Sequence, residues 1–189
     1  MRMLAHTNFS YMGETLLERQ VFKAPHEPTK ARGEAVTFLH LVNGAGVLHT
    51  PTRSYPMAPS DSAILTPAGK GRIEWNKNAD GAPHAALLVH FHPDVLLAGF
   101  QGVVPEMFRL TTAATSHHIN RIAIDQHVSN YIAGLEFYFR KPELMNDELM
   151  VLKVKELLCL LVHSEEADAM CAITSQLFDI ALQRQHTAS

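Results

Sequence analysis

The sequence contains little cysteine, the residue on which small secreted domains depend for stability. Its 189 residues include two cysteines, Cys159 and Cys171. Two cysteines cannot form the disulfide framework of a secreted module. Both lie in apolar, helix-like contexts, so we expect reduced core thiols in a cytoplasmic protein.

Long apolar runs and an excess of positive charge are also absent. The longest apolar runs, residues 157–162 and 85–89, are far shorter than the roughly 20 residues that a membrane-spanning helix requires. Residues 1–13 contain no apolar stretch typical of a signal peptide. The formal net charge is −3, which predicts no general attraction to nucleic acid or to anionic membranes.

Motifs of the common catalytic sites are missing as well. The chain has no G-x-S-x-G nucleophile turn, no G-x-G-x-x-G motif and no Walker loop. The Gly-Ala-Gly at 44–46 has no helix after it, so it is interpreted as a turn. These absences argue against nucleotide binding and nucleophilic catalysis.

Strand patterns dominate the first half of the chain, which is 47% hydrophobic overall and long enough for one well-packed domain. Apolar residues alternate through 36–42, and the turn residues 43–46 then predict a hairpin with a return strand at 47–50. Three prolines punctuate short strands after it: Pro51, Pro56 and Pro59. Further strands are expected at 14–23, 63–66, 72–76 and 85–92. The pattern predicts a small β-barrel or jelly roll.

The second half of the chain has the periodicity of helices. A short helix is expected at 93–99, followed by three amphipathic helices and a polar tail at 183–189. Their apolar stripes are Ile124, Val128, Tyr131, Leu135 and Tyr138; Met150, Val154, Leu157 and Leu161; and Met170, Ile173, Leu177 and Ile180. We therefore expect a barrel in residues 1–95 and a helical extension in residues 96–189, packed together as one domain.

Four stretches of the sequence carry a resemblance to a known family. "LVNGAGVL" at 41–48 and "SYPMAPSDSAILTPAG" at 54–69 resemble the glycine turn and the P-x-G turn of the cupin superfamily. "ALLVHFHPDVL" at 86–96 and "VLKVKELLCLLVHSEEADAM" at 151–170 resemble the last barrel strands and the following helix of the amino-terminal effector domain of AraC-type transcription regulators. The resemblance covers residues 10–178 and implies a cupin-like jelly-roll barrel followed by about three α-helices.

The resemblance does not extend to the cupin metal site. Metal-binding cupins place two histidines and a glutamate before the first glycine turn and another histidine after P-x-G. Here the glutamate place holds Thr37, the early histidine places fall within 30–33, and the late place holds Arg72. None of these positions holds the expected ligand, so we expect no cofactor and no enzyme.

Strand alternation selects six residues as a candidate ligand-binding lining of the barrel interior: Phe38, His40, Arg72, Trp75, His90 and His92. An error of one residue in the assigned face would exchange them for their neighbours. Arg72 would favour an anionic ligand if it points inward, and would be an ordinary surface charge if it points outward. The alternative is a cupin enzyme whose metal is held by barrel histidines: His40, His49, His90 and His92.

The helical stripes leave two interpretations open. Either they pack on the barrel of their own chain, or one of them belongs to a twofold homodimer interface, as the resemblance implies. The residues expected at that interface are Ile124, Val128, Tyr131, Leu135, Tyr138, Val154, Leu157 and Leu161.

The favoured function is a domain that binds a small-molecule effector and couples its binding to dimer geometry. A regulator that acts only through partner chains is a further alternative. The stripes are apolar and few basic residues follow position 142, so the sequence predicts no helix-turn-helix and no specific DNA binding by this chain alone. We expect the effector half of a longer regulator, and the alternative is a free-standing relative.

Overall fold

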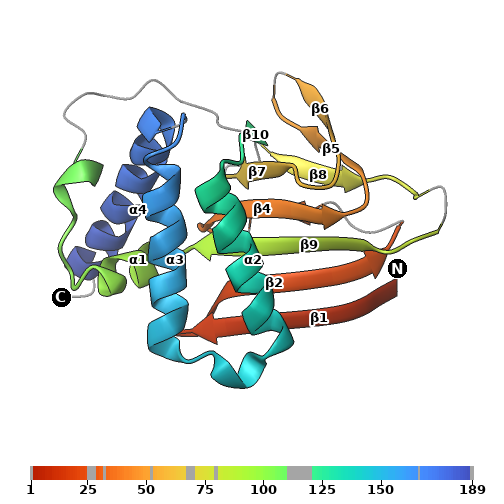
Figure 1. The fold of residues 1–189 in the computed structure, drawn as a ribbon. Coiled ribbons are helices and arrows are strands. Elements are labelled where there is room, and N and C mark those ends of the chain that lie inside the picture. Colours follow the sequence, from red (N-terminus) through yellow and green to blue (C-terminus); the bar gives the residue numbers. More distant parts are fainter. Residues whose placement is uncertain are drawn as a thin grey trace.

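Two antiparallel sheets and a group of helices make up the structure, a computed structural model (Figure 1). It describes residues 2–24, 29–31, 33–51, 53–66, 71–78, 81–109, 121–165 and 167–187. The large sheet has the order β1 (Arg2–Tyr11), β2 (Glu14–Lys23), β9 (His84–Phe91), β4 (Val36–Asn43), β7 (Ser62–Leu65) and β10 (Arg121–Ile122). The small sheet has the order β3 (Thr29–Lys30), β8 (Arg72–Trp75), β5 (Gly46–His49) and β6 (Ser54–Met57).

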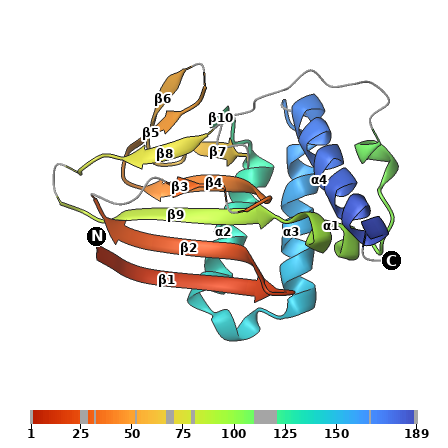
Figure 2. The same cartoon turned by 180° about the vertical axis from the view of Figure 1, so that it is seen from behind.

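The helices follow β1 to β9 along the chain. They are α1 (Pro93–Gly99), α2 (Gln126–Arg140), α3 (Asp147–Leu161) and α4 (Ala167–Thr187), with short 3-10 turns η1 (Glu106–Phe108) and η2 (Pro142–Leu144). The strand β10 lies between α1 and α2. Asp125 and Asn146 cap α2 and α3 by accepting a backbone N–H of the first turn. Figure 1 shows α2 and α3 in front of the large sheet, and Figure 2 shows the strands from the other side. No helix in the described ranges has the length and apolar character needed to cross a bilayer.

The two faces of the large sheet belong to two separate cores. Leu39 and Leu41 of β4 belong to the inner core, which also contains residues of the small sheet such as Ile73. Val36 and Phe38 of the same strand belong to the helix core, together with residues of α2, α3 and α4. Alternate residues of one strand therefore serve different layers, as the twofold periodicity of a strand requires.

The chain between β4 and β5 turns a corner between the two sheets, so the predicted hairpin is wrong. β4 pairs with β7 and β9, whereas β5 pairs with β6 and β8. Gly44 has a φ of 104° and lies so close to His84 that a Cβ would overlap the imidazole ring. The glycine allows both the backbone conformation and the close approach. The choice of strand partners, however, depends on residues far along the chain.

Two elements extend beyond the prediction from sequence. β1 forms an edge strand paired with β2, although no strand was predicted there. α4 continues to Thr187, through residues expected to form a polar tail. Arg184, close to the end of α4, donates to Asp94 at 2.7 Å and also pairs with Glu34. These ion pairs link the last turns of α4 to α1 and to the loop before β4.

The apolar stripes of α2 and α3 are covered by the chain itself, which corrects the residues expected at a dimer interface. Six of those eight residues are at most 3% exposed: Val128, Tyr131, Leu135, Val154, Leu157 and Leu161. The other two, Ile124 and Tyr138, are half-buried. An amphipathic helix places its apolar stripe on the nearest apolar surface, which here is the large sheet. Any dimer contact of these helices must use their opposite sides.

Candidate ligand site

The interior between the two sheets contains a buried carboxylate that is fully partnered. Glu18 is 0% exposed; its Oε1 lies 2.6 Å from Nε2 of His6, and its Oε2 lies 3.2 Å from Nε2 of His90. Gln20 donates to Oε1 at 2.6 Å, and Thr37 Oγ1 lies 2.9 Å from Nδ1 of His90. Burying a carboxylate is costly unless such partners surround it. Both Glu18 oxygens and both His90 nitrogens are thus engaged, and the cluster links side chains of β1, β2, β4 and β9 within the large sheet.

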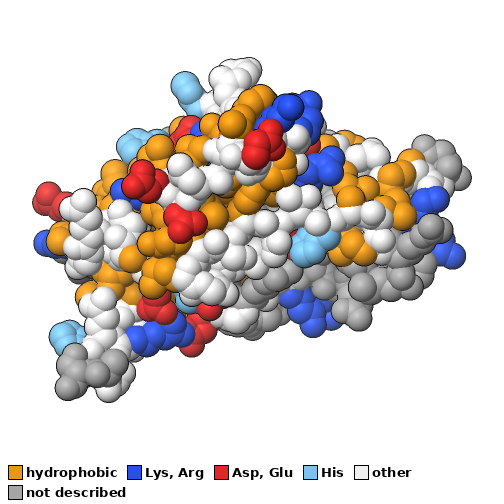
Figure 3. Space-filling model, turned by 90° about the horizontal axis from the view of Figure 1, so that it is seen from below, with side chains coloured by type: hydrophobic (Ala, Val, Ile, Leu, Met, Phe, Trp, Pro, Cys, Tyr) orange, Lys and Arg blue, Asp and Glu red, His pale blue; other side chains and the backbone are white. Residues whose placement is uncertain are grey.

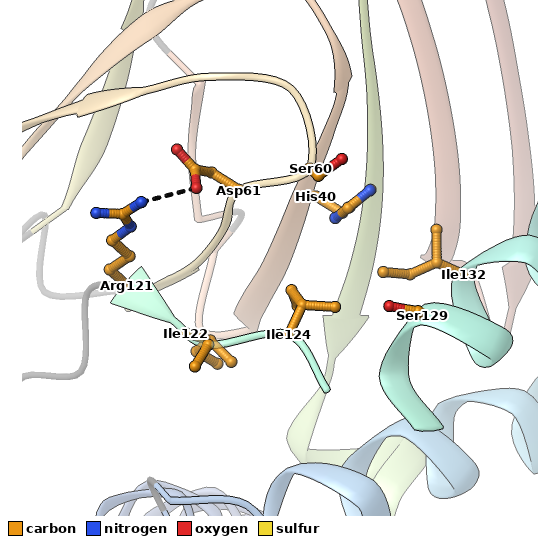
Figure 4. A pocket seen from close by; sticks show the side chains of 9 residues that line it. His40, Ser60, Asp61, Arg121, Ile122, Ile124, Ser129 and Ile132 are labelled. Carbon is orange, nitrogen blue, oxygen red and sulfur yellow. Dashed lines mark hydrogen bonds and ion pairs between the residues drawn. The ribbon is translucent and has the colours of Figure 1, made fainter. Parts of the chain in front are cut away.

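A pocket of about 690 Å³ lies at the edge of the large sheet, between β10 and the start of α2 (Figure 4). His40 projects into it from β4 and is 8% exposed. Its Nδ1 lies 2.9 Å from Ser62 Oγ, and no described residue hydrogen-bonds to its Nε2. Burial lowers the pKa of His40 to about 4, against a smaller opposing effect of the Asp61 carboxylate. The ring is therefore neutral near pH 7 and has one nitrogen available to a ligand.

The rest of the lining combines an apolar wall with one ion pair. The wall comes from β10, the segment after it and α2: Ile122, Ile124 and Ile132. At the rim, Arg121 Nη2 donates to Asp61 Oδ1 at 2.8 Å, and Asp61 Oδ2 accepts the backbone N–H of Ala58 at 2.8 Å. Ser129 of α2 directs its hydroxyl toward the pocket (Figure 4). One positive and one negative charge leave the lining without net formal charge.

Two of the six predicted lining residues lie on the opposite face from the one expected. Phe38 belongs to the helix core, and His40 opens into the pocket beside α2 rather than into the barrel. Both faces of β4 are buried, so polarity along this strand does not distinguish the inner face from the outer one. The inner and outer faces of β4 were therefore exchanged in the prediction.

Of the other four predicted residues, His90 and His92 line one pocket of about 570 Å³ together with Glu14 and Arg184, whereas Trp75 and Arg72 are not part of its lining. Trp75 lies in the inner core and donates to Thr29 Oγ1 at 3.0 Å, while His90 joins the Glu18 cluster. Arg72 is exposed on β8, and His92 lies just after β9. The outward position of Arg72 removes the reason to expect an anionic ligand inside the barrel.

The four histidines considered as metal ligands are also dispersed. His40 has Ser62 as its partner, His49 Nε2 lies 3.1 Å from Glu74 Oε2 on the small sheet, and His92 Nε2 lies 3.4 Å from Glu14 Oε1. Within the described ranges, no group of three His, Cys, Asp or Glu residues has an arrangement that could hold a metal ion. These donors give no support to a metal-dependent enzyme.

Sequence reasoning missed most of the pocket. Asp61 and Arg121 are 60 residues apart, and the short strand β10 brings them together by pairing with β7. Ile132 and Ser129 belong to a helix that carries a clear apolar stripe, but the stripe does not indicate where the helix leaves a gap. Of the pocket residues, only His40 was predicted to contact a ligand, because strand alternation placed it in the barrel lining, whereas Ile124 was predicted at a dimer interface.

Comparison with known proteins identifies the class of fold first. ToxT K231A from Vibrio cholerae has 10% sequence identity and a TM-score of 0.57, with coverage of 92% of this chain and 65% of that chain. This chain thus spans less than two thirds of that relative. A putative mannose-6-phosphate isomerase from Ralstonia eutropha JMP134 has 18% identity and a TM-score of 0.35, over 47% of this chain and 85% of that one. The predicted fold class is confirmed in its architecture, antiparallel sheets followed by a group of helices.

The family is identified by a family model that matches the sequence. The model of the ExsA N-terminal regulatory domain matches residues 36–173, and no curated protein matches the chain. The chain belongs to this family and is an amino-terminal regulatory domain of the AraC type, as its resemblance predicted.

Proposed function

We propose that this regulatory domain senses a small molecule in the pocket around His40 and controls a homodimer through α2. The observation that carries the proposal is a buried imidazole with one nitrogen bound to Ser62 and the other open to a sizeable pocket. Both Glu18 oxygens and both His90 nitrogens have partners, which suits a structural role, whereas a half-partnered imidazole in a pocket suits ligand binding. The family match favours regulation over catalysis.

The pocket is well placed to influence α2. Ser129 and Ile132 contribute to the pocket wall and lie in the first half of this helix. A ligand that fills the pocket would contact α2 directly and would favour one position of the helix over others. On this proposal the barrel residues 1–95 and the helical residues 96–189 act as one domain, because β10 of the second part pairs with the large sheet.

The side of α2 that faces away from the sheet suits contact with a second copy. Asn130, Ala133 and Phe137 are exposed there and carry no charge, and Phe137 is 45% exposed. On α3, Leu152 is 56% exposed, also opposite the buried stripe. Seen from the end where α2 joins α3, hydrophobic side chains form a band interrupted by single acidic groups (Figure 3). A twofold contact through this surface is self-complementary and closed.

The dimer is tested by Phe137→Glu, with Met107→Glu as the matched control because Met107 is also 45% exposed but lies on η1. Sedimentation equilibrium is expected to give a monomer for Phe137→Glu and an unchanged dimer for Met107→Glu. Equal behaviour of both variants and the unaltered chain would rule out this interface.

Coupling is tested without any ligand by Ser129→Trp, which places an indole in the pocket. The dimer dissociation constant of Ser129→Trp is expected to change severalfold. Asn130→Trp is the control, because Asn130 is the neighbouring residue and lies on the proposed interface, so this variant shows the effect of an indole at the interface itself. An unchanged dimer dissociation constant for Ser129→Trp would argue against control through the pocket.

On this proposal, DNA contact is assigned to a separate domain. We therefore expect no specific footprint on DNA with this chain alone.

A further inference from the structure

The chemistry of the pocket restricts the kind of molecule it can bind. The following inference rests on the proposed function, since it takes the pocket around His40 as the effector site. Three features of the lining matter: its charge balance, its apolar wall and the hydrogen-bonding state of His40.

Charged groups in the lining are already matched. Arg121 is paired with Asp61, and both oxygens of Asp61 accept hydrogen bonds. An anion would face the Asp61 carboxylate, and a cation would face the Arg121 guanidinium. Either charge would also lose water against the isoleucine wall, which is unfavourable without a new partner of opposite charge.

His40 favours a group that can both donate and accept. Its Nδ1 bonds with the Ser62 hydroxyl, which can serve either as donor or as acceptor. The proton of the neutral ring therefore lies on Nδ1 or on Nε2, and Nε2 accepts or donates accordingly. A hydroxyl on the ligand matches both tautomers, and the Ser129 hydroxyl offers a second polar contact.

We infer that the pocket binds an uncharged, hydroxyl-bearing molecule whose apolar body lies against Ile122, Ile124 and Ile132 and whose hydroxyl bonds to Nε2 of His40. The pocket volume of about 690 Å³ suits an organic molecule of ordinary effector size. The inner core is not involved, and the Glu18 cluster is expected to be indifferent to the ligand.

Three probes with the same ring test the charge preference: benzyl alcohol, benzoate and benzylamine. Their binding is followed at pH 7.4 by the NMR methyl resonances of Ile122 and Ile132 in the full chain. Benzyl alcohol is expected to shift these resonances, with benzoate and benzylamine binding at least about tenfold more weakly.

Variants test the role of His40. His40→Leu is expected to weaken benzyl alcohol binding by about fivefold to tenfold through loss of one hydrogen bond, and His40→Gln to weaken it less. His40→Gln also serves if His40→Leu does not fold. His49→Leu is the matched control, because His49 Nδ1 lies 3.0 Å from Ser54 Oγ in a similar His–Ser pair away from the pocket.

The outcomes separate the ligand class from the proposed function. Tighter binding of benzoate or benzylamine, lost in His40→Leu, would overturn the uncharged class while leaving a ligand site at the pocket. Equal binding of the alcohol by the unaltered chain and His40→Leu would overturn the role of His40. No shift with any probe would overturn the inference as a whole, whereas the Phe137→Glu and Ser129→Trp measurements test the proposed function without a ligand.

Discussion

Two buried polar sites on opposite faces of the large sheet differ in their hydrogen bonding. On the inner face, Glu18 and His90 have all their polar side-chain atoms engaged. On the helix face, His40 has one partner and one open nitrogen beside a pocket. Both sites contain a buried histidine in an apolar sheet, so residue type and burial alone do not distinguish them. What differs between these two sites is the completeness of their hydrogen bonding and the presence of a pocket beside His40.

The largest expected effect is on the inner face. Glu18→Ala removes the carboxylate that joins His6, Gln20 and His90, and we expect a loss of about 3–5 kcal/mol in the free energy of unfolding measured with urea. Glu18→Gln keeps the shape and one oxygen acceptor, so its loss should be clearly smaller. A loss below about 1 kcal/mol for Glu18→Ala would show that the cluster is not structural, and the comparison would fail.

The corner between the two sheets should be the next most sensitive position. Gly44→Ala puts a Cβ into the ring of His84 at a φ of 104°, so we expect a loss of about 2–4 kcal/mol in unfolding free energy. Gly81→Ala is the matched control: its φ is 69°, but nothing lies within 4 Å of the added Cβ. Backbone strain alone should cost it about 1 kcal/mol. Equal losses of unfolding free energy in Gly44→Ala and Gly81→Ala would mean that the overlap with His84 does not contribute to the cost of Gly44→Ala.

The helix face should be sensitive to pH through His40. Its pKa is lowered from 6.5 to about 4 by burial, so between these values the unfolded chain binds more protons than the folded one. The contribution of His40 to stability is therefore present above pH 6.5 and is lost as the pH falls to about 4, by at most about 1.4 kcal/mol per pH unit. Urea midpoints measured across this range should decline less steeply in His40→Leu, and an unchanged slope would contradict this assignment.

The rim of the pocket should matter least for stability. The ion pair of Arg121 and Asp61 is partly exposed, and such pairs contribute about 0–1 kcal/mol. Arg121→Ala is therefore expected to change the unfolding free energy by less than Gly44→Ala. A loss above about 2 kcal/mol, measured by urea unfolding, would indicate that β10 depends on this ion pair for its pairing with β7.

The sequence by itself determined the kinds of element and the family. Alternation predicted the strands that became β2, β7, β8 and β9, and the apolar stripes predicted α2, α3 and α4, because burying one face imposes a period of 2 or 3.6 residues. The resemblance carried by the glycine turn and the P-x-G turn predicted the family, and the family match bears this out, although residues 67–69 of the P-x-G turn lie outside the described residues.

Tertiary structure decided which elements meet, and this determined the candidate site. β4 is buried on both faces, so its sequence does not say that His40 belongs to the helix side. The turn at Gly44 has the composition of a hairpin, and only the pairing of β4 with β9 and of β5 with β8 makes it a corner. Arg121 reaches Asp61 because β10 joins the edge of the sheet 60 residues further along the chain. Local periodicity indicates that a residue is buried. Which neighbour covers that residue, and whether a gap is left beside it, depends on contacts between residues distant in sequence.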